Sequence, residues 1–171
     1  LESVVHYDLV LGEQRLPLNA LLGQKLRLTF TGQIFCDACG RRTNKSFAQG
    51  HCYPCMTALA RCDMCIMKPE TCHYAAGTCR EPTWGERHCM TPTIVYLANT
   101  SELKVGITRA NQVPTRWMDQ GATQALPILS AQTRHIAGLV EVTLAKTLAD
   151  KTSRRAILKG DANALDLRAL A

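Results

Sequence analysis

The chain has 171 residues, 46% of them hydrophobic, and a formal net charge of +6 from 20 Lys and Arg against 14 Asp and Glu. This composition argues against a disordered chain and suits one or two small globular domains. No apolar run approaches the about 20 residues that a membrane-spanning helix needs, so we expect a cytoplasmic protein without a membrane partner. The positive charge suits a polyanionic partner, DNA or RNA.

Residues 1–35 are expected to form a small antiparallel β meander. Apolar side chains alternate with other residues over 5–11 and again over 26–30, which is the period of a β-strand. Turn residues that include Gly12 and Gly23 lie between these two runs. This part of the chain carries no pattern that indicates chemistry.

All nine cysteines lie within residues 36–92, which we call the cysteine-rich segment. In a reducing compartment, cysteines two residues apart are typical of metal ligands, and an odd number cannot pair completely as disulfides. The first four follow the Cys-x-x-Cys repeat that can place four thiolates around one tetrahedral zinc ion. These predicted ligands are Cys36, Cys39, Cys52 and Cys55.

A second metal ion is predicted further along the segment, where five cysteines are available for four positions. Pro and Gly residues break this part into loops without a conventional core. We therefore expect two structural zinc ions, one at each set of ligands, to hold the cysteine-rich segment. An iron–sulfur cluster on the same thiols is the alternative to zinc. The preferred ligands are Cys62, Cys65, Cys72 and Cys79, with Cys89 as an alternative to either of the last two and His73 and His88 as further candidates.

Residues 93–171 are expected to form a third unit, a small antiparallel sheet flanked by helices. Two runs rich in β-branched residues, 93–98 and 103–107, predict a hairpin. Residues 126–131 predict a third strand, which Pro127 restricts to an irregular or edge position. The whole chain is therefore predicted to be α+β, with a β meander, a zinc-knuckle segment and this sheet in chain order.

Three helices are expected in the same unit. Residues 134–148 carry an apolar stripe of helical period, and Glu141 lies at the edge of that stripe. The residues expected on the packed face are Ile136, Leu139, Val140, Leu144 and Leu148. Shorter helices are expected over 114–120 and 153–159.

Several residues of this unit resemble the GIY-YIG nuclease superfamily, over roughly residues 93 to 150. In that family a Tyr, a second triplet ending in Gly, an Arg on the following helix and a Glu on a later helix converge on one cleft. The second triplet here is Lys-Val-Gly, with Lys104 where the family usually has Tyr, and Gln120 stands where a His is often found. The matching positions are Tyr96, Gly106, Arg116 and Glu141.

The resemblance implies a metal-dependent phosphodiester endonuclease. Tyr96 would position or deprotonate the attacking water, Glu141 would hold one Mg²⁺, and Arg116 would stabilise charge on the phosphoryl group. Lys104 is expected to donate to a phosphate oxygen. Further nucleic-acid contacts are expected from Arg109, Arg134, Lys151, Arg154 and Arg155.

Two other functions fit the same sequence. One is a DNA- or RNA-binding module without catalysis, and the other is a zinc-dependent adaptor that binds a protein partner. The whole chain also resembles an uncharacterised bacterial family of unknown function, through residues 78–81, 84–89 and 104–109. That resemblance implies no activity.

Overall fold

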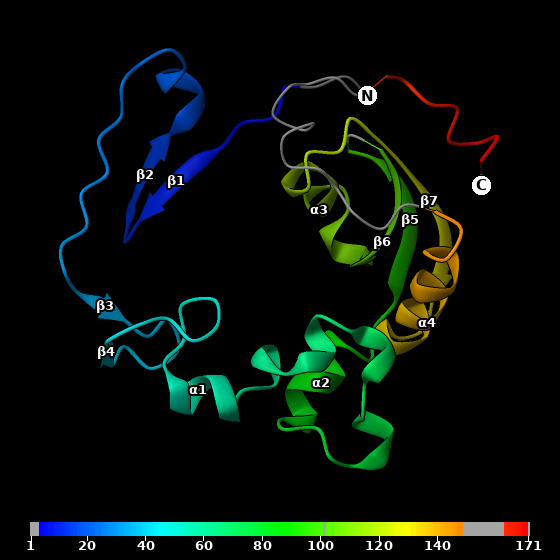
Figure 1. Ribbon diagram of the computed structural model, residues 1–171, viewed down its shortest axis with the longest axis horizontal. Coiled ribbons are helices and arrows are strands. Elements are labelled where there is room, and N and C mark those ends of the chain that lie inside the picture. The colour runs from blue at the N-terminus through cyan, green and yellow to red at the C-terminus, as the bar shows by residue number, and fades with distance from the viewer. Residues whose placement is uncertain (1–3, 101, 149–162, 171) are drawn as a thin grey trace.

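The structure is a computed structural model that describes residues 4–100, 102–148 and 163–170. It combines small antiparallel sheets with short helices, and the cysteine-rich segment lies between the N-terminal hairpin and the C-terminal sheet (Figure 1). The predicted α+β fold class is confirmed. The helix predicted over 153–159 lies outside the described residues. Within the described ranges, no helix has the length and apolarity that crossing a membrane requires.

The N-terminal part is a hairpin followed by an irregular extended segment. Strands β1 (Asp8–Leu11) and β2 (Gln14–Pro17) pair antiparallel, and the 3₁₀ turn η1 (Leu18–Leu21) follows. The strand predicted over 26–30 was wrong, because these residues adopt no strand and Leu28 is 84% exposed. Alternation of apolar residues does not make a strand where no neighbouring strand supplies hydrogen bonds and packing.

The cysteine-rich segment is built from very short elements. Four hydrophobic residues are buried within residues 36–92, and three of them are Cys36, Cys52 and Cys89. An aliphatic core is therefore missing from this segment. Its elements, with the strand that precedes it, are β3 (Ile34–Phe35), β4 (Arg42–Thr43), α1 (Tyr53–Ala58), η2 (Ala60–Cys62), η3 (Met64–Ile66), η4 (Pro69–Thr71), η5 (Tyr74–Ala76) and α2 (Pro82–His88).

The C-terminal part contains a three-stranded antiparallel sheet in the order β6-β5-β7. The central strand β5 (Thr93–Asn99) pairs with β6 (Leu103–Arg109) on one side and with β7 (Gln124–Ala131) on the other. The predicted hairpin and third strand are both present. Pro127 lies in the edge strand β7, at a register shift in its pairing with β5, where a missing N–H is tolerated.

Two helices cover opposite faces of this sheet (Figure 1). Helix α3 (Thr115–Asp119) packs on one face through Trp117, whose ring centroid lies 5.8 Å from that of Tyr96. Because side chains alternate along a strand, Tyr96 and its neighbours in β5 point to different faces. Helix α4 (Arg134–Leu144) covers the other face, where the buried core consists of Val95, Leu97, Val105, Ala131 and Ala137.

Helix α4 also docks the cysteine-rich segment, through a close contact at Gly138. A Cβ built on Gly138 would lie 2.6 Å from the Cβ of Pro69 and 2.8 Å from the backbone nitrogen of Glu70. The buried face of α4 therefore differs from the predicted apolar stripe and includes the residue at that contact. Ala137 and Gly138 are buried, whereas Leu139, which was expected on the packed face, is 48% exposed.

Replacing Gly138 with Ala is expected to lower the free energy of unfolding by about 1–3 kcal/mol, because the new methyl group must displace the backbone of the cysteine-rich segment. Helix propensity alone would give the opposite sign, a gain of roughly 0.5–1 kcal/mol. Urea unfolding of the zinc-loaded protein measures the change. The control is Val142→Ala, at a position of α4 that is 41% exposed. If Gly138→Ala is as stable as the parent protein or more so, the docking contact is not close.

Candidate functional site

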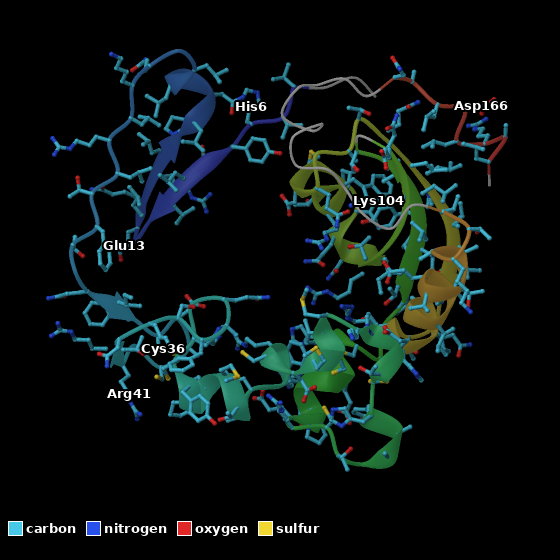
Figure 2. The ribbon with its side chains drawn as sticks, viewed as in Figure 1. His6, Glu13, Cys36, Arg41, Lys104 and Asp166 are labelled. Atoms are coloured by element: carbon cyan, nitrogen blue, oxygen red, sulfur yellow. The ribbon has the colours of Figure 1, made fainter. Side chains whose placement is uncertain are left out.

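The four cysteines of the first predicted zinc site come together. Their sulfur atoms all lie within 4.8 Å of one another, and those of Cys39 and Cys52 are 3.8 Å apart. Around a zinc ion with bonds of 2.3 Å, tetrahedral sulfurs are about 3.8 Å apart, so the group could hold one zinc ion. The cluster lies beside β3, where Figure 2 labels Cys36. Its members are Cys36, Cys39, Cys52 and Cys55.

The backbone around Cys36 favours its thiolate. Gly40 has a φ of +66°, which permits the turn in which its N–H donates to the carbonyl of Cys36 at 2.8 Å. The N–H of Cys52 donates to the Cys36 sulfur at 3.3 Å, and this hydrogen bond is the main cause that lowers the pKa of Cys36 to about 6. Hydrogen bonding with Cys39 and Cys52 raises the pKa of Cys55 to about 12, so a bound zinc ion must displace that proton.

The second predicted set of ligands does not form a comparable group in the described part of the chain. Asp63, Cys65 and His73 have ligand atoms within 4.8 Å of one another. However, an oxygen of the Asp63 carboxylate already forms an ion pair with Arg80 at 2.7 Å, and Nε2 of His73 lies 3.5 Å from the same oxygen. Because Arg80 engages that oxygen, this trio is better described as part of an Asp63–Arg80 ion pair than as a metal site. His88, the other candidate histidine, stacks on a tryptophan instead.

Three of the four residues predicted to be catalytic line one cavity of about 270 Å³. The cavity lies along the edge strand β6, between α3 and α4, and the cysteine-rich segment closes one side. Lys104 is labelled on β6 in Figure 2. The polar lining residues are Lys104 from β6, Arg116 and Gln120 from α3 and its C-terminal end, and Arg134 and Glu141 from α4.

Tyr96, the fourth predicted residue, lies behind the wall of this cavity. It is fully buried, and its hydroxyl donates to Oε1 of Gln120 at 2.6 Å. Its partner across the strands is Gly106, where a Cβ would lie 2.8 Å from the Tyr96 hydroxyl, so the tyrosine ring requires a glycine there. Burial raises the pKa of Tyr96 to about 12, opposed by nearby Arg116 and reinforced by Glu141. A neutral phenol at physiological pH favours positioning of water over its deprotonation.

A second cavity, of about 320 Å³, adjoins the first and carries four arginines. Arg116 and Arg134 line both cavities, whereas Arg61 and Arg109 line the second. Asp119 supplies a carboxylate against these four guanidinium groups, which leaves an excess of positive charge that suits phosphate groups. Three other predicted contacts lie outside the described residues, namely Lys151, Arg154 and Arg155.

Sequence reasoning missed part of the second cavity. The rings of Trp84 and His88 stack with centroids 4.2 Å apart and an interplanar angle of 8°, and both line the cavity. Their spacing of four residues on α2 was an available signal for such a pair. Arg61 immediately precedes Cys62. Because this stretch was predicted to bind metal, Arg61 was not considered as a phosphate contact.

Zinc removal is expected to unfold residues 36 to 90, because metal–thiolate bonds would supply the stability that an aliphatic core does not. Cys36 and Cys52 are 2% and 3% exposed, so alkylation of both should be slow in the zinc-loaded protein and fast after chelation. Mass spectrometry of digested, alkylated protein measures each rate, and the far-ultraviolet circular dichroism should change in parallel. Unchanged rates and an unchanged spectrum after complete metal removal would show that metal does not hold this segment.

A family model described as a protein of unknown function (DUF2797) matches residues 23–171, a range that includes all nine cysteines and the residues of both cavities. No curated protein and no solved structure matches the chain. The resemblance to GIY-YIG nucleases therefore rests on the motif residues alone.

Proposed function

The chain belongs to the DUF2797 family of proteins of unknown function, and we propose that it is a zinc protein that binds DNA or RNA in the two adjoining cavities. We further propose that the first cavity hydrolyses phosphodiester bonds with Mg²⁺. One observation carries the proposal. Lys104, Arg116 and Glu141 come from β6, α3 and α4 and line the same cavity. Two structural zinc ions are part of the proposal, one at Cys36–Cys55 and one in the later half of the cysteine-rich segment.

The charge of the two cavities supports a nucleic-acid ligand. Arg116 and Arg134 are shared by both cavities, so the basic lining is continuous from Lys104 on β6 to Arg61 in the cysteine-rich segment. Arginine guanidinium groups match the geometry of phosphate oxygens through paired hydrogen bonds. A tract of this kind suits a ligand with successive phosphates, such as a nucleic-acid backbone.

The chemistry follows from the lining of the first cavity. A Mg²⁺ ion held by Glu141 would polarise a phosphoryl oxygen and activate water. Arg116 and Lys104 would donate hydrogen bonds to phosphate oxygens and stabilise the charge that develops there. Tyr96 would orient water through its hydroxyl, together with the Gln120 side chain to which it donates.

A binding module without catalysis is the second candidate, and one observation favours it. Tyr96 is fully buried and its hydroxyl is already engaged with Gln120, so substrate would reach it only if that hydrogen bond opened. The basic lining would then hold nucleic acid without cutting it. A zinc-dependent adaptor for a protein partner is a further outcome of the tests.

Nucleic-acid binding is expected to weaken steeply with salt, because each neutralised phosphate releases counterions. Arg61→Ala and Arg109→Ala should each weaken the affinity for mixed-sequence DNA or RNA and reduce the slope of log K against log salt by about 1. Fluorescence anisotropy between low and moderate salt measures both. Arg15→Ala, on strand β2 and 72% exposed in its side chain, is the matched control and should change neither value. Absence of binding even at low salt would reject the proposal in favour of the adaptor.

Cleavage is expected to require divalent metal and Glu141. Glu141→Gln keeps the size of the side chain but removes the charge that holds the metal, so nicking of mixed DNA and RNA substrates should fall by roughly 10²–10³-fold while binding persists. Glu102→Gln, at an exposed residue just before β6, is the control for loss of one carboxylate. Cleavage that continues unchanged in Glu141→Gln would place the activity elsewhere. Tight binding with no cleavage by the parent protein would support the binding module.

A further inference from the structure

We propose that Cys65, Cys72, Cys79 and Cys89 bind the second zinc ion, and that Cys62 is the cysteine left without a metal. This inference deepens the zinc part of the proposed function and rests on the presence of two zinc ions, but not on nucleic-acid binding. It changes the ligand set that sequence spacing favoured, in which Cys62 paired with Cys65 and Cys89 was a substitute for Cys72 or Cys79.

The carrying observation is one very small cavity beneath α2. Its volume is about 20 Å³, which is room for one water molecule or ion. Among the five cysteines that follow Cys55, four line this cavity and Cys62 does not. Four cysteines around one small space are the donor set typical of a closed structural zinc site. The four are Cys65, Cys72, Cys79 and Cys89.

These four cysteines come from separate short elements around the small cavity. Cys65 lies in η3, Cys72 directly follows η4, and Cys89 directly follows α2. The thiol of Cys89 interacts electrostatically with those of Cys72 and Cys79, and the thiol of Cys65 with those of Cys72 and Cys89. Helix α2 approaches closely at Gly85, where a Cβ would lie 3.3 Å from the sulfur of Cys79.

The four sulfurs do not all lie within 4.8 Å of one another, in contrast to the first cluster. Zinc with bonds of 2.3 Å would therefore draw the side chains inward by rotation about their Cα–Cβ bonds. Arg134 lies beside such a site, because its backbone N–H donates to the carbonyl of Cys89 at 2.8 Å, and its positive charge acts on the Cys89 thiol. Cys62 lies in η2 and faces other groups, since its electrostatic partners are Arg61, Arg80, Cys36 and Glu81.

The position of this site gives the second ion a structural role in ligand binding. Trp84 and Cys89 line both the small cysteine cavity and the arginine-lined cavity. Zinc at Cys89 would fix the end of α2 and, through the Cys89 carbonyl, the start of α4 at Arg134. The wall of the arginine-lined cavity would thus be held in place by a metal that does not contact the nucleic acid.

Metal content of the full chain tests the inference. Protein purified with zinc should hold two ions by inductively coupled plasma or native mass spectrometry. Cys62→Ser should still hold two, Cys89→Ser should hold one, and Cys89→His should recover the second because histidine is also a zinc ligand. In Co²⁺-loaded Cys62→Ser, both ions should show the strong thiolate charge-transfer and tetrahedral d–d absorption of four-sulfur sites, as in the parent protein.

Several results would overturn the inference. These are one zinc ion in the parent protein, loss of an ion or of tetrahedral four-sulfur absorption in Cys62→Ser, or two ions retained in Cys89→Ser. If protein purified without air contains iron and acid-labile sulfide, these cysteines bind an iron–sulfur cluster and not zinc. If Cys89→Ser does not fold, Cys62→Ser still decides, because it must keep both ions. None of these readings involves DNA or RNA, so failure here is separate from failure of nucleic-acid binding.

Discussion

Burial of sulfur in place of aliphatic side chains is the constraint that the rest of the structure depends on. Residues 36–92 bury Cys36, Cys52, Ala60 and Cys89 as their hydrophobic residues, so the hydrophobic effect has little area to act on there. A structural zinc ion contributes on the order of 10–16 kcal/mol to the folding of small peptides at neutral pH, which is enough to offset the missing burial. With zinc bound, thiolate–metal bonds rather than packing would hold the short strands and single-turn helices of this segment.

The cysteine-rich segment in turn forms part of the candidate site. Gly138 lets Pro69 approach α4 closely, and Arg134 donates from Nη2 to the carbonyl of Ile66 at 2.5 Å. Ile66 lines both of the larger cavities, so neither cavity is complete without the docked segment. The cysteine-rich segment therefore shapes the walls of both cavities through residues that are not among its predicted metal ligands.

Local patterns predicted the parts of the fold that local interactions determine. The strands of the β5–β6 hairpin follow from their β-branched residues, the edge position of β7 from Pro127, and the first zinc cluster from the spacing of Cys36 to Cys55. Contacts distant in sequence determined the rest. Residues 26–30 alternate as a strand does but have no strand partner in the described chain.

The same limit applies to the candidate sites. Pro69, which is far away in the sequence, packs on Gly138 and so determines which face of α4 is buried. The apolar stripe of α4 alone therefore predicted burial of Leu139, which is exposed. Spacing predicted Cys62 and Cys65 as ligands of one ion, whereas in the structure Cys65 lines the small cavity and Cys62 does not. Convergence of Lys104, Arg116 and Glu141 on one cavity depends on β6, α3 and α4 packing together, and the order of residues could indicate it only through a family resemblance.

Hydrogen exchange of the zinc-loaded protein, with and without a short mixed-sequence oligonucleotide and Mg²⁺, tests most directly that the two cavities form the nucleic-acid site. Slower exchange is predicted for amides of β6, α3 and the first turns of α4, together with residues 61–67, because these segments line the cavities. The β1–β2 hairpin should be unaffected. Protection confined to residues 36–55, with no change at β6 or α4, would contradict the assignment and place the nucleic acid on the first zinc cluster.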